Sequence, residues 1–118
     1  MMDYTDLDVW KVSRELVKSV YQLTQKFPKE EIYGLTNQLR RCVVSVPSNI
    51  AEGVGRQSNK ETIHFLYIAK GSLNEVETQL YLAFDLEFIS KAELNLILEK
   101  LVSSKKLLNG FINYYKKL

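Results

Sequence analysis

The sequence predicts an all-α protein, an antiparallel up-down-up-down four-helix bundle that assembles as a homo-oligomer. Apolar residues recur every three or four positions through four segments, and no alternating strand pattern competes with them. The connections between these segments are short, which favours antiparallel neighbours. With 118 residues, of which 46% are hydrophobic and 25% charged, the chain is expected to form one domain over residues 1–118.

The first helix is expected over residues 6–26. Thr5 together with Asp8 provides a start signal, and Pro28 ends the segment. Trp10 and Tyr21 lie outside its apolar stripe and add apolar surface, which indicates an oligomer interface. The stripe itself is Val9, Val12, Leu16, Val20, Leu23 and Phe27.

The second helix is expected over residues 35–55 and contains Pro47, which disfavours a helix by roughly 3 kcal/mol. We therefore interpret the segment as built for something beyond packing. Pro47 is expected to kink or open the helix, with Ser or Asn side chains satisfying the freed carbonyl. Gly53 and Gly55 are expected to end it. Its apolar stripe is Leu39, Val43, Val46, Ile50 and Val54. Its polar stripe is Arg41, Ser45, Asn49, Glu52 and Arg56.

The third and fourth helices are expected over residues 59–88 and 91–117. Each opens with a capping box, Ser58 with Glu61 and Ser90 with Glu93. Ser104 occupies an expected apolar place in the fourth helix. The seam of the third helix is Leu66, Ala69, Leu73, Val76, Leu80 and Ala83. The apolar positions of the fourth are Leu94, Ile97, Leu101, Leu108, Phe111 and Tyr115. Further apolar residues outside the seam indicate an oligomer interface: Phe65, Tyr67, Tyr81 and Leu82.

Charge is unevenly distributed although the formal net charge is only +2. Residues 35–60 and 100–118 are basic, with net charges of +3 and +5, and residues 61–99 carry −5. The favoured interpretation is that these elements neutralise one another where they pack or where subunits meet. The alternative is a basic surface for nucleic acid or another acidic partner.

Several classes of protein are excluded by the sequence. Cys42 is the only cysteine, so it is expected to be a small core residue in a reducing compartment. No apolar stretch approaches the roughly 20 residues of a membrane span, and the acidic start at Met1–Asp6 is unlike a signal peptide. We therefore expect a cytoplasmic protein.

A metal site at Glu61 and His64 is not expected, because a di-iron bundle needs two such motifs. Signatures of enzymes and of cofactor binding are absent, so we expect no enzyme activity and no cofactor.

Short motifs along the chain resemble those of a known family. They include Leu7-Asp8-Val9-Trp10, Gln38-Leu39-Arg40-Arg41, the run from Ser45 to Gly53, Gly71-Ser72-Leu73, and Glu75. Over nearly its whole length the sequence resembles the small four-helix-bundle proteins found within intervening sequences of bacterial 23S ribosomal RNA genes. This resemblance implies a ring-shaped homopentamer. A similar group, the accessory proteins of diversity-generating retroelements, implies RNA or DNA and a nucleic-acid-processing protein as partners.

Two functions follow from these residues. The first is a non-enzymatic accessory protein that binds nucleic acid, RNA above all, through guanidinium and ammonium groups. The residues expected to bind are Arg40, Arg41, Arg56, Lys105 and Lys106. The favoured alternative for the arginines is that they pair with Glu75 and Glu77 of the third helix. The C-terminal lysines interleave with aromatic residues that could stack bases, although a solvated helix face is the favoured interpretation.

The second function is a protein-interaction scaffold whose polar stripe serves assembly or receives a partner helix. Small polar residues in the second helix form either an open groove or a surface that another helix approaches closely, and close approach is favoured. Gly71 and Ser72 are then the facing partners. The motif residues concerned are Ser45, Pro47, Ser48, Asn49, Glu52, Gly53, Gly71, Ser72 and Glu75.

Overall fold

A computed structural model describes residues 3–118 and contains four long helices, and no strand occurs among those residues. The α-helices are α1 (Asp8–Thr24), α2 (Leu35–Val54), α3 (Asn59–Asp85) and α4 (Lys91–Lys116). Two short 3₁₀ helices, η1 (Tyr4–Asp6) and η2 (Lys29–Tyr33), precede α1 and α2. The acidic start that was expected not to be a signal peptide includes Met1 and Met2. These two residues lie outside the described residues. None of the helices described is both long and apolar enough to cross a membrane.

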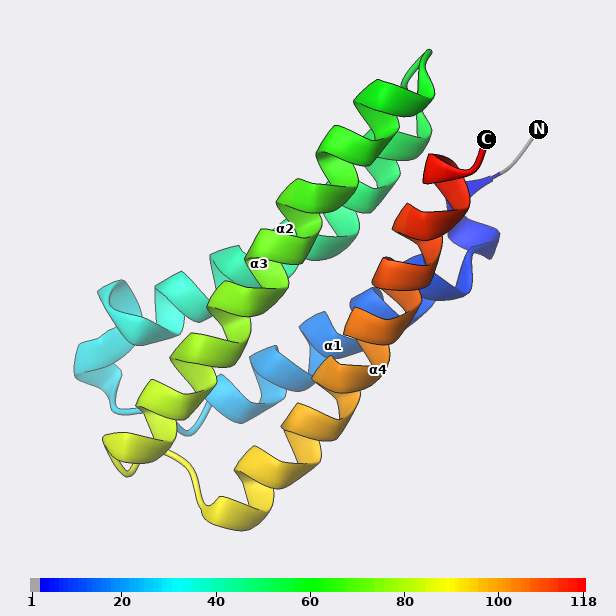
Figure 1. The fold of residues 1–118 in the computed structure, drawn as a ribbon. Coiled ribbons are helices and arrows are strands. Elements are labelled where there is room, and N and C mark those ends of the chain that lie inside the picture. Colours follow the sequence, from blue (N-terminus) through cyan, green and yellow to red (C-terminus); the bar gives the residue numbers. More distant parts are fainter. Residues whose placement is uncertain (1–2) are drawn as a thin grey trace.

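The four helices lie side by side along one direction (Figure 1). The start of α1, the turn between α2 and α3 and the end of α4 lie at one end, and the other two connections lie at the opposite end (Figure 1). Helix α1 contacts α2 and α4, and α3 also contacts α2 and α4. Each helix therefore has two neighbours and one outward side.

The core follows the predicted apolar stripes closely. All six seam residues of α3, Leu66 through Ala83, are fully buried. In α2 the predicted stripe is buried as far as Ile50, but the next core position is Gly53 instead of Val54. In α4 Ser104 is buried between Leu101 and Leu108, and the last core residue is Ile112, whereas Phe111 is only partly buried.

The start of α1 differs from the prediction based on Thr5 and Asp8. Helix α1 begins at Asp8 after Leu7, which makes no side-chain capping bond. Asp3 instead caps the short helix η1, accepting from the backbone N–H and the hydroxyl of Thr5 at 3.0 and 2.8 Å. Thr5 therefore interacts with Asp3 at the start of η1 and does not cap α1. The apolar periodicity of the sequence did not predict this short helix.

Helix α2 continues through Pro47 to Val54. The side-chain amide of Asn49 donates to the Ser45 carbonyl at 2.8 Å. It does not reach Val43, the carbonyl that loses its usual donor to the proline. Of the two glycines expected to end the helix, Gly55 is the C-cap, as predicted, whereas Gly53 lies within the last turn. Gly53 has a packing role, which is described below.

The caps of α3 and α4 show how two similar sequences differ in detail. Ser90 and Glu93 form the full reciprocal capping box, with bonds of 3.1 and 2.8 Å. Ser58 accepts from the Glu61 backbone N–H at 3.2 Å, but only this half of the box is formed. Both serines satisfy a backbone donor that the first turn of a helix leaves without a partner.

Candidate functional site

Two of the five predicted basic residues are already paired with carboxylates. Arg56 forms an ion pair with Glu52 one turn earlier on α2. Lys105 of α4 contacts Glu77 of α3 at 2.7 Å. The expected pairing of the arginines with Glu75 and Glu77 is not found within residues 3–118, where Glu77 pairs with Lys105 and a Glu75 carboxylate oxygen lies 3.4 Å from the Cys42 Sγ. These pairs reduce the charge that Arg56 and Lys105 can offer to a phosphate.

Arg40 faces α1, whereas Arg41 lies on the outer side of α2. The Arg40 guanidinium lies 4.7 Å from the ring centre of Tyr21, and its Nε donates to the Thr24 hydroxyl at 2.9 Å. Consecutive helical residues point about 100° apart, so Arg41 points away from Arg40, and it is exposed. Lys106 is exposed on α4. The predicted basic residues thus do not form a single surface within one subunit.

The lysines of α4 are divided between two of its sides. Lys100 donates to Ser19 of α1 at 2.8 Å. Lys116 lies over the ring of Tyr67 on α3, 5.1 Å from its centre. The C-terminal basic segment is therefore not one continuous strip, because its residues point toward different neighbouring helices.

Part of the polar stripe of α2 forms the contact between α2 and α3. The hydroxyls of Ser45 and Ser72 lie 2.9 Å apart. The Asn49 amide donates to the Ser45 hydroxyl at 2.8 Å. Ser72 faces α2 as the close-approach interpretation expected, but Gly71 points to open space. Gly53 is the glycine that allows close approach, since its backbone packs on Thr62 and Phe65.

Cys42 lies beside this polar contact and is buried. Its Sγ lies 3.4 Å from the Ser72 carbonyl oxygen and 3.4 Å from a carboxylate oxygen of Glu75. Burial raises the pKa of the Cys42 thiol to about 12, and the hydrogen bond to Glu75 adds to the rise. Because only the thiolate is a strong nucleophile, this cysteine is suited to packing.

Pro47 and Ser48 lie in a different groove from Ser45 and Asn49. They line a hollow of about 320 Å³ between α1 and α2, together with residues of α1 and η1. A second hollow, of about 420 Å³, lies in the same α1–α2 groove and includes Arg40. The first hollow is lined by Tyr4, Trp10, Arg14, Val17, Val44, Pro47, Ser48 and Ala51. The second is lined by Thr24, Gln25, Phe27, Pro28, Lys29, Ile32, Thr36 and Arg40.

The charged residues lining these two hollows are all cations: Arg14, Lys29 and Arg40. The Arg14 guanidinium lies 5.4 Å from the ring centre of Trp10, which repeats the stacking of Arg40 on Tyr21. We call this surface the arginine–aromatic groove, defined by Tyr4, Trp10, Arg14, Tyr21 and Arg40. The sequence pattern predicts an oligomer interface at Trp10 and Tyr21 and does not single out Arg14. The spacing of Trp10, Arg14 and Tyr21, at i, i+4 and i+11, was the signal available.

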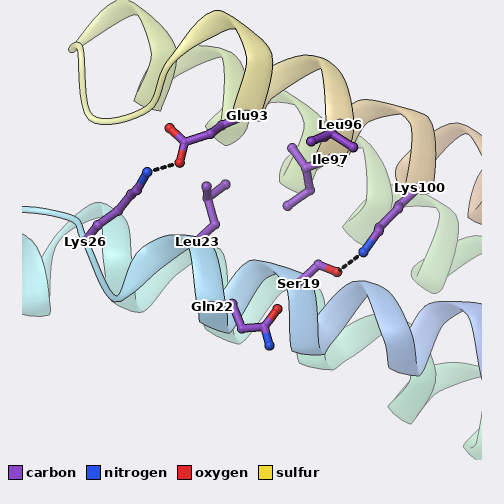
Figure 2. Close-up of a pocket in the computed structure, with 8 residues that line it drawn as sticks. All are labelled: Ser19, Gln22, Leu23, Lys26, Glu93, Leu96, Ile97 and Lys100. Atoms are coloured by element: carbon purple, nitrogen blue, oxygen red, sulfur yellow. Dashed lines mark hydrogen bonds and ion pairs between the residues drawn. The ribbon is translucent and has the colours of Figure 1, made fainter.

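The cleft between α1 and α4 has a different character (Figure 2). It has a volume of about 300 Å³ and contains the apolar side chains of Leu23 and Ile97. Lys26 forms an ion pair with Glu93, and Lys100 donates a hydrogen bond to Ser19. These two polar interactions lie on either side of the apolar residues (Figure 2). Because these polar groups already bind one another, the cleft is best explained as helix packing.

No metal-binding cluster of three or more His, Cys, Asp or Glu side chains occurs within residues 3–118. The resemblance noted from the sequence is confirmed by comparison with protein families. The model of the 23S rRNA-intervening sequence protein family matches residues 5–110. A crystal structure from Bacteroides thetaiotaomicron, of a protein of unknown function from the S23 ribosomal protein family, has a TM-score of 0.79 and 26% identity. The match covers 88% of this chain and 97% of that one. A search of curated proteins found no match.

Proposed function

The chain belongs to the 23S rRNA-intervening sequence protein family, and from that premise we propose that it is a non-enzymatic, self-assembling four-helix bundle that binds RNA. The observation that carries the proposal is the arginine–aromatic groove, in which every charged residue lining the two hollows is a cation. Phosphate contacts supply most of the affinity of non-specific nucleic-acid binding. The role is that of an accessory protein that holds RNA.

Self-assembly is part of this proposal because one subunit has little charge. A net charge of +2 gives a single copy weak attraction for a polyanion. A ring of antiparallel up-down-up-down bundles, with five copies as the resemblance implies, repeats the same groove around one particle. Linked weak sites then bind with an avidity that one site lacks.

Salt dependence of RNA binding tests the proposal. Filter binding of a single-stranded oligoribonucleotide is measured at about 50 mM and about 200 mM salt, where backbone binding weakens steeply. Replacing Arg14 or Arg40, which line the two hollows, with Gln is expected to weaken binding. Arg56→Gln and Lys105→Gln serve as matched controls with smaller effects, because both side chains are already paired. Absence of binding at about 50 mM salt would remove the proposal.

A protein-interaction scaffold is the second candidate, and it is favoured by the outward side of α3. Gly71 lies inside this helix, where glycine costs about 1 kcal/mol relative to alanine, yet a Cβ there would meet nothing within 4 Å. Packing within the subunit therefore does not require this glycine. Ile68 and Leu82 are exposed on the same helix, at a spacing that places them on the side of Gly71.

Large substitutions on this side test the scaffold function. On this account the surface contacts a second copy in the assembly. We therefore expect Gly71→Leu or Ile68→Glu to disrupt that contact and dissociate the assembly, which light scattering measures. If the assembly survives while a protein partner is lost, the same surface serves partner docking. If RNA binding weakens only when the assembly dissociates, avidity and not this surface carries the RNA contact.

A further inference from the structure

The arginine–aromatic groove combines a line of rings with a line of cations. Trp10, Arg14 and Tyr21 lie on the side of α1 that faces α2. Trp10 and Arg14 line the hollow between the two helices, and Tyr21 contacts Arg40 of α2. From Trp10 to Tyr21 the helix rises by roughly 16 Å. Stacked bases in a strand are about 3.4 Å apart, so this length accommodates several nucleotides.

We infer that the groove binds unpaired RNA bases, with one base stacked in the hollow at Trp10 and the following phosphates held by Arg14 and Arg40. This inference rests on the proposed function and names the form of RNA that the site takes. Proteins that bind single strands combine a positively charged groove with aromatic rings on which bases stack. Both components are present here on one side of the molecule.

The hollow beside Trp10 has the size and lining that a base needs. Its volume of about 320 Å³ falls at the lower end of the range of about 300–1,000 Å³ typical of small-molecule sites. Tyr4 contacts Trp10 edge to face, with ring centres 5.4 Å apart. The α2 side of the hollow is formed by Val44, Pro47, Ser48 and Ala51, so on this side a flat ring would meet an apolar wall and the Ser48 hydroxyl.

The arginines keep the donors that a phosphate requires. A guanidinium that stacks on a ring uses its face, whereas its N–H donors lie in its plane. The hydrogen bond found for Arg40 uses Nε, toward Thr24. Its two terminal nitrogens can then donate to phosphate oxygens, which suits the paired geometry that arginine offers.

The geometry favours a single strand over a duplex. In an RNA duplex the bases are stacked on one another, and side chains cannot read the deep, narrow major groove. A duplex would therefore contact only the cations of the groove, and Trp10 would make no base contact. A single strand can place a base on the ring and its phosphates on the arginines.

Fluorescence of Trp10 provides a direct test, because Trp10 is the only tryptophan in the chain. The full-length protein is titrated with a mixed-sequence single-stranded oligoribonucleotide and, separately, with the same strand in a duplex. We expect the single strand to quench Trp10 emission and to bind at least about tenfold more tightly than the duplex. Trp10→Leu, which keeps an apolar side chain, should weaken single-strand binding by about 5-fold to about 100-fold.

Two further variants make the test specific. Arg14→Gln should weaken binding and leave the fold unchanged by circular dichroism, because Arg14 is exposed. Tyr67→Leu is the matched control, since it removes an aromatic ring stacked with Lys116 on the α3–α4 side. It should leave the affinity for the single strand unchanged.

The outcomes separate this inference from the proposed function. If RNA binds with no change in Trp10 emission, or binds equally as strand and duplex, the inference fails and the proposed function stands. If no RNA binds, both fail. If acrylamide cannot quench Trp10 in the free assembly, a second copy covers the groove and the inference is overturned.

Discussion

The hydroxyl of Thr62 donates a 2.7 Å hydrogen bond to the carbonyl of Gly53, which ties the last turn of α2 to the first turn of α3. A Cβ on Gly53 would lie 3.0 Å from the Cβ of Phe65 and 3.2 Å from the carbonyl oxygen of Thr62. Backbone and Cβ atoms cannot swing aside as the end of a flexible side chain can. The α2–α3 turn is therefore closed at a separation that suits glycine.

Replacing Gly53 with alanine is expected to destabilise the protein by about 1–2 kcal/mol. Overpacking costs about 1–3 kcal/mol, and the better helix propensity of alanine offsets up to about 1 kcal/mol of this. Urea unfolding at fixed protein concentration measures the change. Gly110→Ala is the control, because a Cβ at this position in α4 meets nothing within 4 Å, and it should stabilise by about 0.5–1 kcal/mol. Equal effects of the two substitutions would contradict the packing role of Gly53.

The hydroxyl contact between Ser45 and Ser72 is expected to couple α2 and α3 energetically. A double-mutant cycle with Ser45→Ala and Ser72→Ala should give a coupling of about 0.5–1.5 kcal/mol, the usual net value of a hydrogen bond. Unfolding free energies of the two single variants and the double variant supply the cycle. Additive effects, within about 0.3 kcal/mol, would show that the 2.9 Å contact contributes nothing to stability.

Removal of the Ser104 hydroxyl is expected to stabilise the protein. Ser104 is buried in α4, and its Oγ has no hydrogen-bond partner among the described residues. An unsatisfied buried hydroxyl costs about 1–3 kcal/mol, so Ser104→Ala should raise the unfolding free energy by about 1 kcal/mol. The exposed neighbour Ser103 is the control, and Ser103→Ala should change stability by less than about 0.5 kcal/mol. A loss of stability in Ser104→Ala would indicate a partner for the hydroxyl.

Cys42 is expected to react slowly while the protein is folded. Its pKa rises from the ordinary 9.0 to about 12, so alkylation near pH 8 should be about a thousandfold slower than in urea. Glu75→Gln should speed labelling only partly, because burial is the larger cause of the rise. Native and denatured rates that agree within tenfold would contradict this account.

The same shift predicts a dependence of stability on pH. Because the pKa of Cys42 is higher in the folded state than in the unfolded state, its contribution to stability is complete below about pH 9. That contribution is lost as the pH rises from about 9 toward about 12. The difference in unfolding free energy between the protein and Cys42→Ala should therefore shrink over this range. A constant difference would rule out the shift.

The sequence was a good guide to the helices and to the core of α3. Apolar residues at alternating steps of three and four match the period of 3.6 residues, so the seam from Leu66 to Ala83 is fully buried. The role of Gly53 could not be predicted in this way. Two glycines near the end of a helix are typical of a C-cap, whereas the space available to a Cβ depends on how closely α3 approaches.

The basic residues illustrate the same limit at the candidate site. The sequence places Arg40 and Arg41 next to each other, but only helix packing determines that Arg40 meets Tyr21. The pairing of Lys105 with Glu77 joins α4 to α3 and depends on their relative register. The arginine–aromatic groove could not be predicted from the sequence, because a partly buried Trp10 suits either an interface between copies or a ligand site.

The mass of the purified protein in solution, with and without single-stranded RNA, tests the central claim most directly. Light scattering should give a multiple of the 13.7 kDa chain mass, five copies if the resemblance holds, and RNA should co-elute at about 50 mM salt and dissociate at high salt. A 13.7 kDa particle that elutes apart from RNA at low salt would contradict both the assembly and its function.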